Sequence, residues 1–388
     1  MKEGIEGWHS DPVHLGLDPR KVNKLVERAA QEVESGLLPS VQIAVARKGK
    51  LAILESFGEA SSDSLFTVFS STKAIISAAL WLLVQEQELS IENKVSAIIP
   101  EFAANGKGDV LVQHLLTHTA GFPAAPFFPL DWLDSRRRIE RFESWYLNWT
   151  PGSSYMYHPS SSMWVVAEII ERLSGMDFQK FVKERISLPL GLPDMHVGMP
   201  ASEASRVLPV IHVGEMITDE EYAAMGLPVP GITEVTEDAI NLFNTESFQA
   251  LGVPGGGGIM GAGELAMFYQ GLLHGGLNGN EIWNASTLQS ATQILTGNLL
   301  DPDTKQLANR GLGVVVAGDE YRNMRGFGKT NSAQAFGHNG VGGQIAWADP
   351  ESGISFAYCT NGVDRNWLRR GRRGTSISSL AASCLAES

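Results

Sequence analysis

Cysteines and long apolar runs are scarce in this sequence. Only Cys359 and Cys384 occur among 388 residues, which is too few for a disulfide scaffold, and they form no CxxC pair. The longest apolar run, residues 74–84, has about half of the ~20 residues that a membrane-spanning helix needs. The polar N-terminus shows no apolar stretch typical of a signal peptide. We therefore expect a cytoplasmic protein that does not interact with membranes.

Positive charge is also in deficit. The chain has 30 Lys and Arg residues against 43 Asp and Glu residues, a net charge of -13, which disfavours binding to a nucleic-acid backbone. Charged residues make up only 19% of the chain and hydrophobic residues 43%, so a large core can form, which argues against disorder. These values indicate an acidic globular protein, most often an enzyme, with a small-molecule substrate and no nucleic-acid partner.

Periodic patterns near the two ends of the chain predict both helices and strands. Residues 19–36 have apolar positions at helical spacing after Asp18, a residue type that caps helix N-termini. Two β-rich runs around residues 47–50 indicate a hairpin, and a turn at residues 349–353 separates two further strands. A last helix is expected at about 376–386.

The middle of the chain, roughly residues 90–300, is expected to be mostly helical with long loops. Helices are predicted at 162–174 and 262–273, whereas residues 208–256 show little periodicity. The length favours two lobes over one. We expect an α/β (α+β) fold, in which the termini form one lobe and a helical lobe is inserted between them. The boundaries are residues 1–68 and 305–388 for the α/β lobe and residues 69–304 for the helical lobe, whose loops cover the active site.

The first candidate for catalysis is Ser70-Ser71-Thr72-Lys73, at the start of a helix at 72–87 that is apolar on nearly all sides and therefore buried. Residues three apart share one helix face, so Lys73 would lie beside the Ser70 hydroxyl. Burial lowers the pKa of a lysine, which lets the amine act as a base near neutral pH. On local grounds, a capping serine followed by a lysine that extends to solvent is an equal alternative.

Two later segments offer partners for such a nucleophile. Tyr157 lies in a loop before a helix and could share a proton with Lys73 and Ser70, although a loop tyrosine is more often a packing residue. The glycine-rich segment 337–343 lets a backbone approach a ligand, and an N–H group near Val341 could complete an oxyanion hole. A glycine-rich entry to a hairpin is the alternative for this second segment.

Five motifs, taken in order, resemble the serine β-lactamase-like superfamily, most closely the class C β-lactamases and family VIII carboxylesterases. The motifs are SSTK at 70–73, HLLTHTAG at 114–121, PGSSYMYHP at 151–159, VPGGGGIMGAGELAMF at 253–268 and GHNGVGGQIAWADP at 337–350. The resemblance implies a two-lobe β-lactamase-like fold with an antiparallel sheet flanked by helices. It also implies that Ser70 is acylated, with Lys73 as its base and Tyr157 as a shared acid/base. The N–H groups of Ser70 and Val341 would form the oxyanion hole.

Two departures from the β-lactamase pattern bear on the substrate. Pro159 stands where β-lactamases of this type have an asparagine, and it has no amide to hold an acylamino group. The family's Lys-Thr-Gly triplet is replaced by His338-Asn339-Gly340, which is largely neutral at pH 7 and lacks the lysine that helps bind a substrate carboxylate. An anionic β-lactam therefore loses two contacts, whereas an ester needs only the acyl-transfer groups and an apolar pocket.

The expected function is hydrolysis of short-chain carboxylic esters by a serine carboxylesterase, with weak β-lactamase activity as a side reaction. The substrate-binding residues that we expect are His338, Asn339, Gly340 and Phe128. The aromatic loop at 121–133 either supplies the wall of an acyl pocket or is a plain surface lid; its side chains are Phe122, Phe127, Phe128 and Trp132. The alternatives are a β-lactamase, a D-amino-acid peptidase or an acyltransferase on the same scaffold, and a non-catalytic penicillin-binding-like protein.

Three further motifs are set aside. His114 and His118 have helical spacing, but Leu115 replaces the glutamate of a zinc protease, so we expect no metal. Residues 256–261 match G-x-G-x-x-G without a strong strand before them, so we expect no dinucleotide and no other cofactor. The basic run 368–373 is expected in a solvated loop before the last helix. The absence of G-x-S-x-G excludes the nucleophile elbow of α/β-hydrolases.

Overall fold

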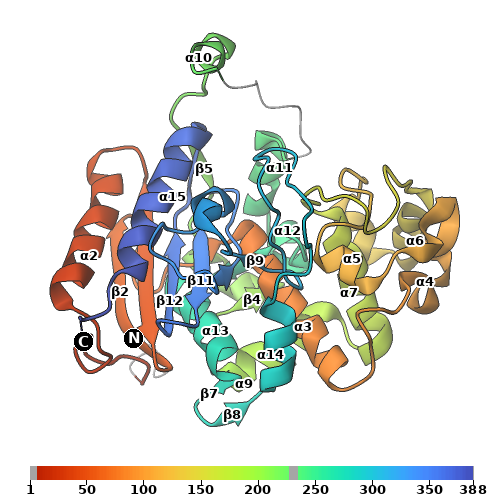
Figure 1. The fold of residues 1–388 in the computed structure, drawn as a ribbon, viewed down its shortest axis with the longest axis horizontal. Coiled ribbons are helices and arrows are strands. Elements are labelled where there is room, and N and C mark those ends of the chain that lie inside the picture. Colours follow the sequence, from red (N-terminus) through yellow and green to blue (C-terminus); the bar gives the residue numbers. More distant parts are fainter. Residues whose placement is uncertain (1–6, 227–234, 388) are drawn as a thin grey trace.

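The computed structural model describes residues 7–226 and 235–387. Within these residues the largest sheet has six strands, which lie mainly in the left half of the view in Figure 1. Each pair of neighbouring strands in this sheet runs antiparallel, and strands from both ends of the chain meet in it. In spatial order the strands are β2 (Lys50–Gly58), β1 (Ser40–Arg47), β12 (Ile354–Cys359), β11 (Ile345–Asp349), β10 (Phe336–Gly337) and β9 (Val315–Val316). The antiparallel sheet that the motifs imply is therefore confirmed.

The two faces of the sheet are covered by different helices. Odd-numbered residues of β1, such as Ile43, pack in one cluster with α2 (Pro19–Glu34) and α15 (Trp367–Ala382). Even-numbered residues such as Ala44 belong to the second cluster, which contains α13 (Ala262–His274). Successive side chains of a strand point to opposite faces of the sheet. The face with the large residues of β1 therefore contacts α2 and α15, and the face with the small residues contacts α13. The small residues allow α13 to approach the sheet closely.

The helix α13 lies in the segment that we expected to belong to the helical lobe, yet it packs on the sheet. Gln270 of α13 donates hydrogen bonds to the Ala46 carbonyl (3.2 Å) and to Ser355 Oγ (3.0 Å), both in sheet strands. The boundaries at residues 68 and 305 stay a prediction, and α13 links the sheet to the helical part of the chain.

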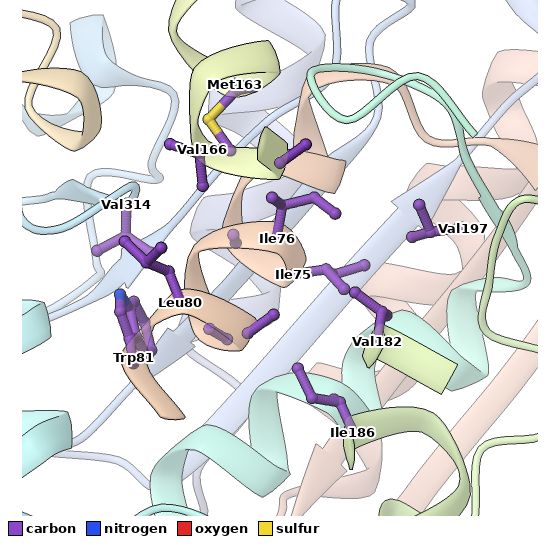
Figure 2. Packing of buried hydrophobic residues seen from close by; sticks show 14 of the residues in the cluster. Ile75, Ile76, Leu80, Trp81, Met163, Val166, Val182, Ile186, Val197 and Val314 are labelled. Atoms are coloured by element: carbon purple, nitrogen blue, oxygen red, sulfur yellow. The ribbon is translucent and has the colours of Figure 1, made fainter. Parts of the chain in front are cut away.

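The helix α3 (Thr72–Gln85) runs through the core, as its uniformly apolar sequence predicts. Every residue of α3 from Thr72 to Leu83 is buried. Figure 2 shows Ile76 and Leu80 of α3 among side chains of neighbouring elements, including α7 (Ser161–Ser174). This packing fixes the N-terminus of α3 in space. Although α3 is apolar throughout, none of the helices in the described residues is long and apolar enough to cross a membrane.

Shorter elements connect these parts. Smaller sheets pair β3 (Phe66–Thr67) and β4 (His196–Val197) with β6 (Gly258–Met260), β13 (Gly362–Asp364) with β5 (Ile211–Val213), and β7 (Gly276–Leu277) with β8 (Asn280–Glu281). The other α-helices of the described residues are α4 (Val95–Ile98), α5 (Val112–Leu116), α6 (Ser135–Ser144), α8 (Phe178–Val182), α9 (Leu188–Leu190), α10 (Asp219–Ala224), α11 (Glu237–Asn241), α12 (Glu246–Leu251) and α14 (Ala285–Thr292). Tighter or wider helical turns are η1 (Phe69–Ser71), η2 (Pro100–Asp109), η3 (Pro129–Leu133), η4 (Lys183–Ser187), η5 (Ala201–Arg206), η6 (Leu242–Asn244) and η7 (Glu320–Arg325). The weakly periodic stretch 208–256 contains β5, α10, α11 and α12, and its residues 227–234 lie outside the described part.

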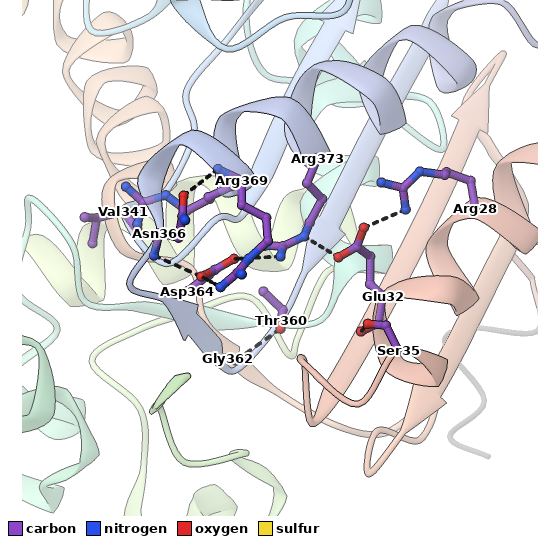
Figure 3. A network of polar contacts seen from close by, with 11 residues as sticks. Arg28, Glu32, Ser35, Val341, Thr360, Gly362, Asp364, Asn366, Arg369 and Arg373 are labelled. Atoms are coloured by element: carbon purple, nitrogen blue, oxygen red, sulfur yellow. Dashed lines mark hydrogen bonds and ion pairs between the residues drawn. The ribbon is translucent and has the colours of Figure 1, made fainter. Parts of the chain in front are cut away.

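The last helix, α15, begins earlier than expected, so the basic run 368–373 lies inside it and not in a solvated loop. Arg373 pairs with Asp364 (2.8 Å) and with Glu32 of α2, and Arg369 also pairs with Asp364 (2.6 Å; Figure 3). These ion pairs neutralise like charges that would otherwise repel one another on the helix. The run therefore connects α15 to α2 and to β13 through ion pairs.

Candidate active site

Ser70 lies at the turn that leads into α3, in the segment η1. The Val68 N–H donates to the Gly258 carbonyl (2.9 Å), and the Gly258 N–H donates to Thr72 Oγ1 (2.8 Å), so β6 holds this turn from one side. Phe69 has a φ of 44°, a left-handed conformation that non-glycine residues rarely adopt. The turn thus presents the half-buried Ser70 at a helix N-terminus, where backbone N–H groups lack intrahelical partners.

Lys73 lies one helical turn after Ser70 and is fully buried. Its Nζ is 3.2 Å from Ser70 Oγ, and it donates to the carbonyl oxygens of Pro159 (2.6 Å) and Gly255 (2.7 Å). Because a carbonyl oxygen only accepts hydrogen bonds, these two contacts require N–H groups of Lys73. The position that faces Ser70 can then hold either a lone pair, which accepts the hydroxyl proton, or a third N–H. A proton can therefore pass from Ser70 to Lys73 without movement of either backbone.

Tyr157 approaches Lys73 from the loop that precedes α7. Lys73 Nζ lies 5.2 Å from the centroid of the Tyr157 ring, and the ring of His118 lies 4.7 Å from it, centroid to centroid. This contact places Tyr157 beside the Ser70–Lys73 pair, where its hydroxyl is a candidate to give and take a proton. The structure therefore brings Ser70, Lys73 and Tyr157 together in one cluster.

Two buried histidines hold the Tyr157 loop in place. The His158 N–H donates to His118 Nδ1 (3.2 Å), and the Phe122 N–H donates to His158 Nε2 (3.2 Å). Burial lowers the pKa of His158 to about 4, and it holds the pKa of His118 well below its usual value. Both rings are therefore neutral at pH 7 and accept hydrogen bonds from backbone groups.

His114 and His118 accept hydrogen bonds from backbone N–H groups. His114 Nδ1 accepts a hydrogen bond from the Leu111 N–H (3.1 Å) at the start of α5, and His118 accepts from the Tyr157 loop. Within residues 7–226 and 235–387, no three His, Cys, Asp or Glu side chains gather in a group that could hold a metal ion.

The segment 338–341 passes beside the nucleophile turn. Ser71 Oγ donates to the His338 carbonyl (2.8 Å), which ties this segment to the first turn of α3. The backbones approach so closely at Gly340 that a Cβ there would lie 2.6 Å from the Val68 carbonyl oxygen. Only glycine can occupy such a position without displacing the backbone.

Val341 is half-buried against the small apolar cluster that contains Phe69, the residue before Ser70. A Cβ at the next residue, Gly342, would lie 3.0 Å from Phe69 Cε2, so this segment runs close to the nucleophile turn. Its carbonyl accepts a hydrogen bond from Arg370 Nη1 (2.5 Å), and Figure 3 shows Val341 beside the start of α15. Arg370 belongs to the basic run that the sequence placed in a solvated loop. The structure instead gives it a contact with the predicted oxyanion segment.

The side chains of the His338-Asn339 pair have different environments. His338 is 5% exposed, and burial holds its pKa well below the usual value. Its Nδ1 donates to the Asn339 carbonyl (3.0 Å), so Nε2 carries the lone pair, and Nε2 has no hydrogen-bond partner among the described residues. The Asn339 side chain is engaged in the fold, since it donates to the Gly326 carbonyl (2.9 Å) and accepts from the Ala346 N–H (3.2 Å). The His338 ring lies 5.9 Å from that of Tyr157, centroid to centroid.

The aromatic loop at 121–133 divides into buried and exposed residues. Phe127 and Trp132 pack against Trp164 of α7, with ring centroids 4.4 Å and 5.2 Å away, so they fill the helical core and do not line a pocket. Phe128 is 59% exposed, and the Arg141 guanidinium lies 4.7 Å from its ring centroid. Phe127, Phe128 and Trp132 belong to the pocket wall that the sequence predicts. Of these three, Phe128 is the one that stays exposed enough to contact a ligand.

An arginine that the sequence did not single out also approaches the cluster. The guanidinium carbon of Arg310 lies 5.4 Å from the centroid of the Tyr157 ring, and Arg310 Nε donates to Tyr155 Oη (2.9 Å). No spacing rule connects residue 310 with the catalytic motifs. Its place in the site depends on a long-range fold that local patterns do not reveal.

The family assignment follows from a comparison with known families. Residues 24–378 match the family model described as Beta-lactamase. This chain belongs to the Beta-lactamase family. Together with the cluster of Ser70, Lys73 and Tyr157, this membership makes the protein a serine hydrolase of the β-lactamase fold, and the fold expected from the motifs is confirmed.

Known relatives of this Beta-lactamase family member include esterases and penicillin-binding proteins. The chain is 26% identical to Esterase/beta-lactamase LipL of Mycobacterium tuberculosis (strain ATCC 25618 / H37Rv) over 322 residues, which cover 78% of this chain and 70% of LipL. A penicillin-binding protein homologue from Caulobacter crescentus has a TM-score of 0.76 and 26% identity, with 95% of this chain and 99% of that chain covered. A family VIII carboxylesterase shares the fold at a TM-score of 0.77 and 24% identity, with 93% and 97% covered.

Proposed function

We propose that this Beta-lactamase family member is a carboxylesterase that cleaves short-chain esters through an acyl-enzyme on Ser70. The contact that carries the proposal is the one between Lys73 Nζ and Ser70 Oγ (3.2 Å), which joins a nucleophile to a base. The choice of an ester over a β-lactam is supported by Pro159, which has no side-chain amide to hold an acylamino group. The esterase part of the name of LipL agrees with this choice.

Proton transfer within the cluster accounts for both halves of the reaction. In acylation, Ser70 Oγ attacks the ester carbonyl and its proton passes to Lys73. Tyr157 relays a proton to the leaving alkoxide, so the alcohol departs and the acyl group stays on Ser70. In deacylation, a water molecule attacks the acyl carbonyl and gives a proton to Tyr157. The proton returns to Ser70 Oγ as the carboxylic acid leaves.

The negative charge of the tetrahedral intermediates requires hydrogen-bond donors beside Ser70. The N–H groups of Ser70 and Val341 are our candidates, because Val341 packs against the apolar cluster that contains Phe69, the residue before Ser70. Backbone donors that point at a developing oxyanion are among the largest contributions to acyl-transfer catalysis. In this proposal, Arg370 positions the donor at Val341 by holding the carbonyl of the same residue.

The proposed role of Tyr157 predicts a large loss when its hydroxyl is removed. Tyr157→Phe is expected to lower kcat for p-nitrophenyl butyrate by about 10²- to 10⁴-fold, the range typical of a general acid/base. Steady-state kinetics measure this effect, and Tyr146→Phe is the matched control because Tyr146 is 71% exposed. An unchanged kcat in the Tyr157 variant would assign the proton relay to another group.

The contact of Arg370 with Val341 predicts an effect on kcat. Arg370→Met is expected to lower kcat by about 10-fold with little change in KM, since a displaced oxyanion donor weakens only the transition state. Arg370→Lys keeps a donor on a long side chain and should retain more activity. Equal kcat values in wild type and the methionine variant, with the same thermal midpoint, would show that α15 does not position the oxyanion hole.

A substrate panel tests the proposed function. We expect p-nitrophenyl acetate and butyrate to be cleaved faster than the octanoate, and nitrocefin to be turned over slowly. All of these activities should disappear in Ser70→Ala. Faster cleavage of nitrocefin than of any ester would contradict the ester assignment and leave the nucleophile unaffected. Turnover that survives in Ser70→Ala would contradict both.

A further inference from the structure

Arg310 is a cation in the candidate site, and none of residues 7–226 and 235–387 gives it an anionic partner. Its Nε donates to Tyr155 Oη (2.9 Å), which is a neutral acceptor. Its Nη1 is buried, and in the described part of the chain it has neither a hydrogen-bond acceptor nor a carboxylate in an ion pair. A buried N–H group without an acceptor costs free energy, and the cost is larger for a charged group. A ligand that supplies an acceptor there would remove this cost.

The position of Arg310 is fixed before any ligand binds. Its N–H donates to Thr296 Oγ1 (3.1 Å), and its carbonyl accepts from the Leu295 N–H (2.8 Å). The guanidinium carbon lies 5.5 Å from the ring centroid of Tyr155 and 5.4 Å from that of Tyr157. The two rings and the hydrogen bond to Tyr155 hold the guanidinium in one orientation. A preordered arginine loses little conformational entropy when it binds a ligand.

The groups around Arg310 do not neutralise it. Burial raises the pKa of Tyr155 to about 12, so its hydroxyl is uncharged at pH 7. His118 and His338 are neutral as well. Burial is the main cause that holds their pKa values well below the usual range, and the positive charge of Arg310 is the second. The negative charge of Asp301 contributes to the raised pKa of Tyr155, but Asp301 forms no ion pair with Arg310 among the described contacts. The charge of Arg310 therefore attracts anions to this part of the site, although the net charge of the whole chain is -13.

We propose that Arg310 binds a carboxylate of the substrate, so that the preferred esters carry a carboxylate in addition to the ester group. This inference rests on the proposed esterase function and names its substrate class. The terminal nitrogens of a guanidinium match the two oxygens of a carboxylate. Arg310 and Lys73 both approach the ring of Tyr157, so a short chain can join an ester carbonyl at Ser70 to a carboxylate at Arg310. Half-esters of short dicarboxylic acids have this form.

The test compares two esters that differ in charge. The p-nitrophenyl half-ester of glutaric acid and p-nitrophenyl valerate have acyl chains of the same length, and only the first carries a carboxylate. The ratio of their kcat/KM values is measured in wild type, Arg310→Met and Arg310→Lys. Arg310→Met is expected to lower the ratio of charged to neutral ester by about 10- to 100-fold, the size of a charge-assisted contact. Arg310→Lys should retain much of the preference.

Two results would overturn the inference. The first is an unchanged ratio in a folded Arg310→Met variant. The second is an equal loss for both esters with a shifted pH profile, which would mean that Arg310 acts on the ionisation of Tyr157. If Arg310→Met does not fold, inhibition of the wild type decides the question. Inhibition by glutarate but not by uncharged glutaramide supports the inference, and equal inhibition contradicts it.

Binding without turnover separates this inference from the proposed function. Calorimetry on Ser70→Ala measures glutarate affinity in a protein that cannot form an acyl-enzyme, and the double variant with Arg310→Met is its control. If the wild type cleaves neither ester, the esterase function fails, while glutarate binding that depends on Arg310 still supports the anion site. If the esters are cleaved but glutarate binds equally to both variants, the anion site alone fails.

Discussion

Replacing Ser70 with alanine is expected to lower kcat/KM for p-nitrophenyl butyrate by roughly 10⁵-fold, since loss of a serine nucleophile removes the covalent route altogether. The residual rate should reflect only binding and oxyanion stabilisation. Ser70 is half-buried in the turn that leads into α3, and its hydroxyl contacts Lys73, so the fold should tolerate the change. Progress curves at high enzyme concentration measure the residual rate, and circular dichroism checks the fold.

A second serine of α3 provides the matched control. Ser77 is fully buried, and its hydroxyl has no hydrogen-bond partner among the described residues. Ser77→Ala should therefore leave kcat/KM close to wild type. A loss of similar size in both variants would mean that the decrease reflects damage to α3. A Ser70→Ala enzyme with substantial activity would remove Ser70 from the mechanism.

Replacing Lys73 with methionine is expected to produce the second-largest effect, a decrease in kcat of about 10³- to 10⁴-fold. The variant retains the Ser70 hydroxyl but has no amine to accept its proton. It also leaves the carbonyl oxygens of Pro159 and Gly255 without the N–H groups that they now bind, so a lower thermal midpoint is expected. The two effects are separated by measuring kcat well below the unfolding temperature.

Lys107 offers a control for the structural part of this loss. It is also fully buried, and its Nζ donates to the carbonyl oxygens of Ala104 (2.5 Å) and Trp145 (2.6 Å). Lys107→Met should lower stability by about 1–3 kcal/mol and leave kcat unchanged. If Lys107→Met lowers kcat as much as Lys73→Met does, the effect at Lys73 is structural and the proposed base is wrong.

Much of the fold around the catalytic cluster could be predicted from local patterns. The predicted helix at 19–36 is α2, and its Asp18 cap accepts from the Arg20 N–H (2.8 Å). The hairpin around 47–50 is formed by β1 and β2, and the apolar helix after Ser70 is buried. In each case the periodicity or turn chemistry lies within a few residues of the element that it specifies, so sequence alone is sufficient.

The misplaced start of α15 shows where local patterns fail. The run Leu368–Arg373 contains four like charges, which are unfavourable on an isolated helix. Its partners, Asp364 and Glu32, lie on other elements and come close only in the folded chain. The fold therefore supplies a neutralising environment that the sequence window does not contain.

The residues of the candidate site also differ in how far the sequence predicts them. Ser70 and Lys73 share a helix, so their proximity follows from helical geometry, and the resemblance of motifs adds Tyr157. Arg310 reaches the site from the segment between α14 and β9, which carries no motif and no periodic signal. Its contribution to the charge of the site emerges only from the three-dimensional arrangement.

The central claim is that Ser70 forms the acyl-enzyme, and covalent labelling tests it most directly. The protein is treated with a p-nitrophenyl phosphonate ester, digested and analysed by mass spectrometry. We predict one adduct per chain, located on Ser70, with release of one equivalent of p-nitrophenol and matching loss of esterase activity. Ser70→Ala should not react. An adduct on another residue, or full esterase activity in a protein whose Ser70 is unlabelled, would contradict the account.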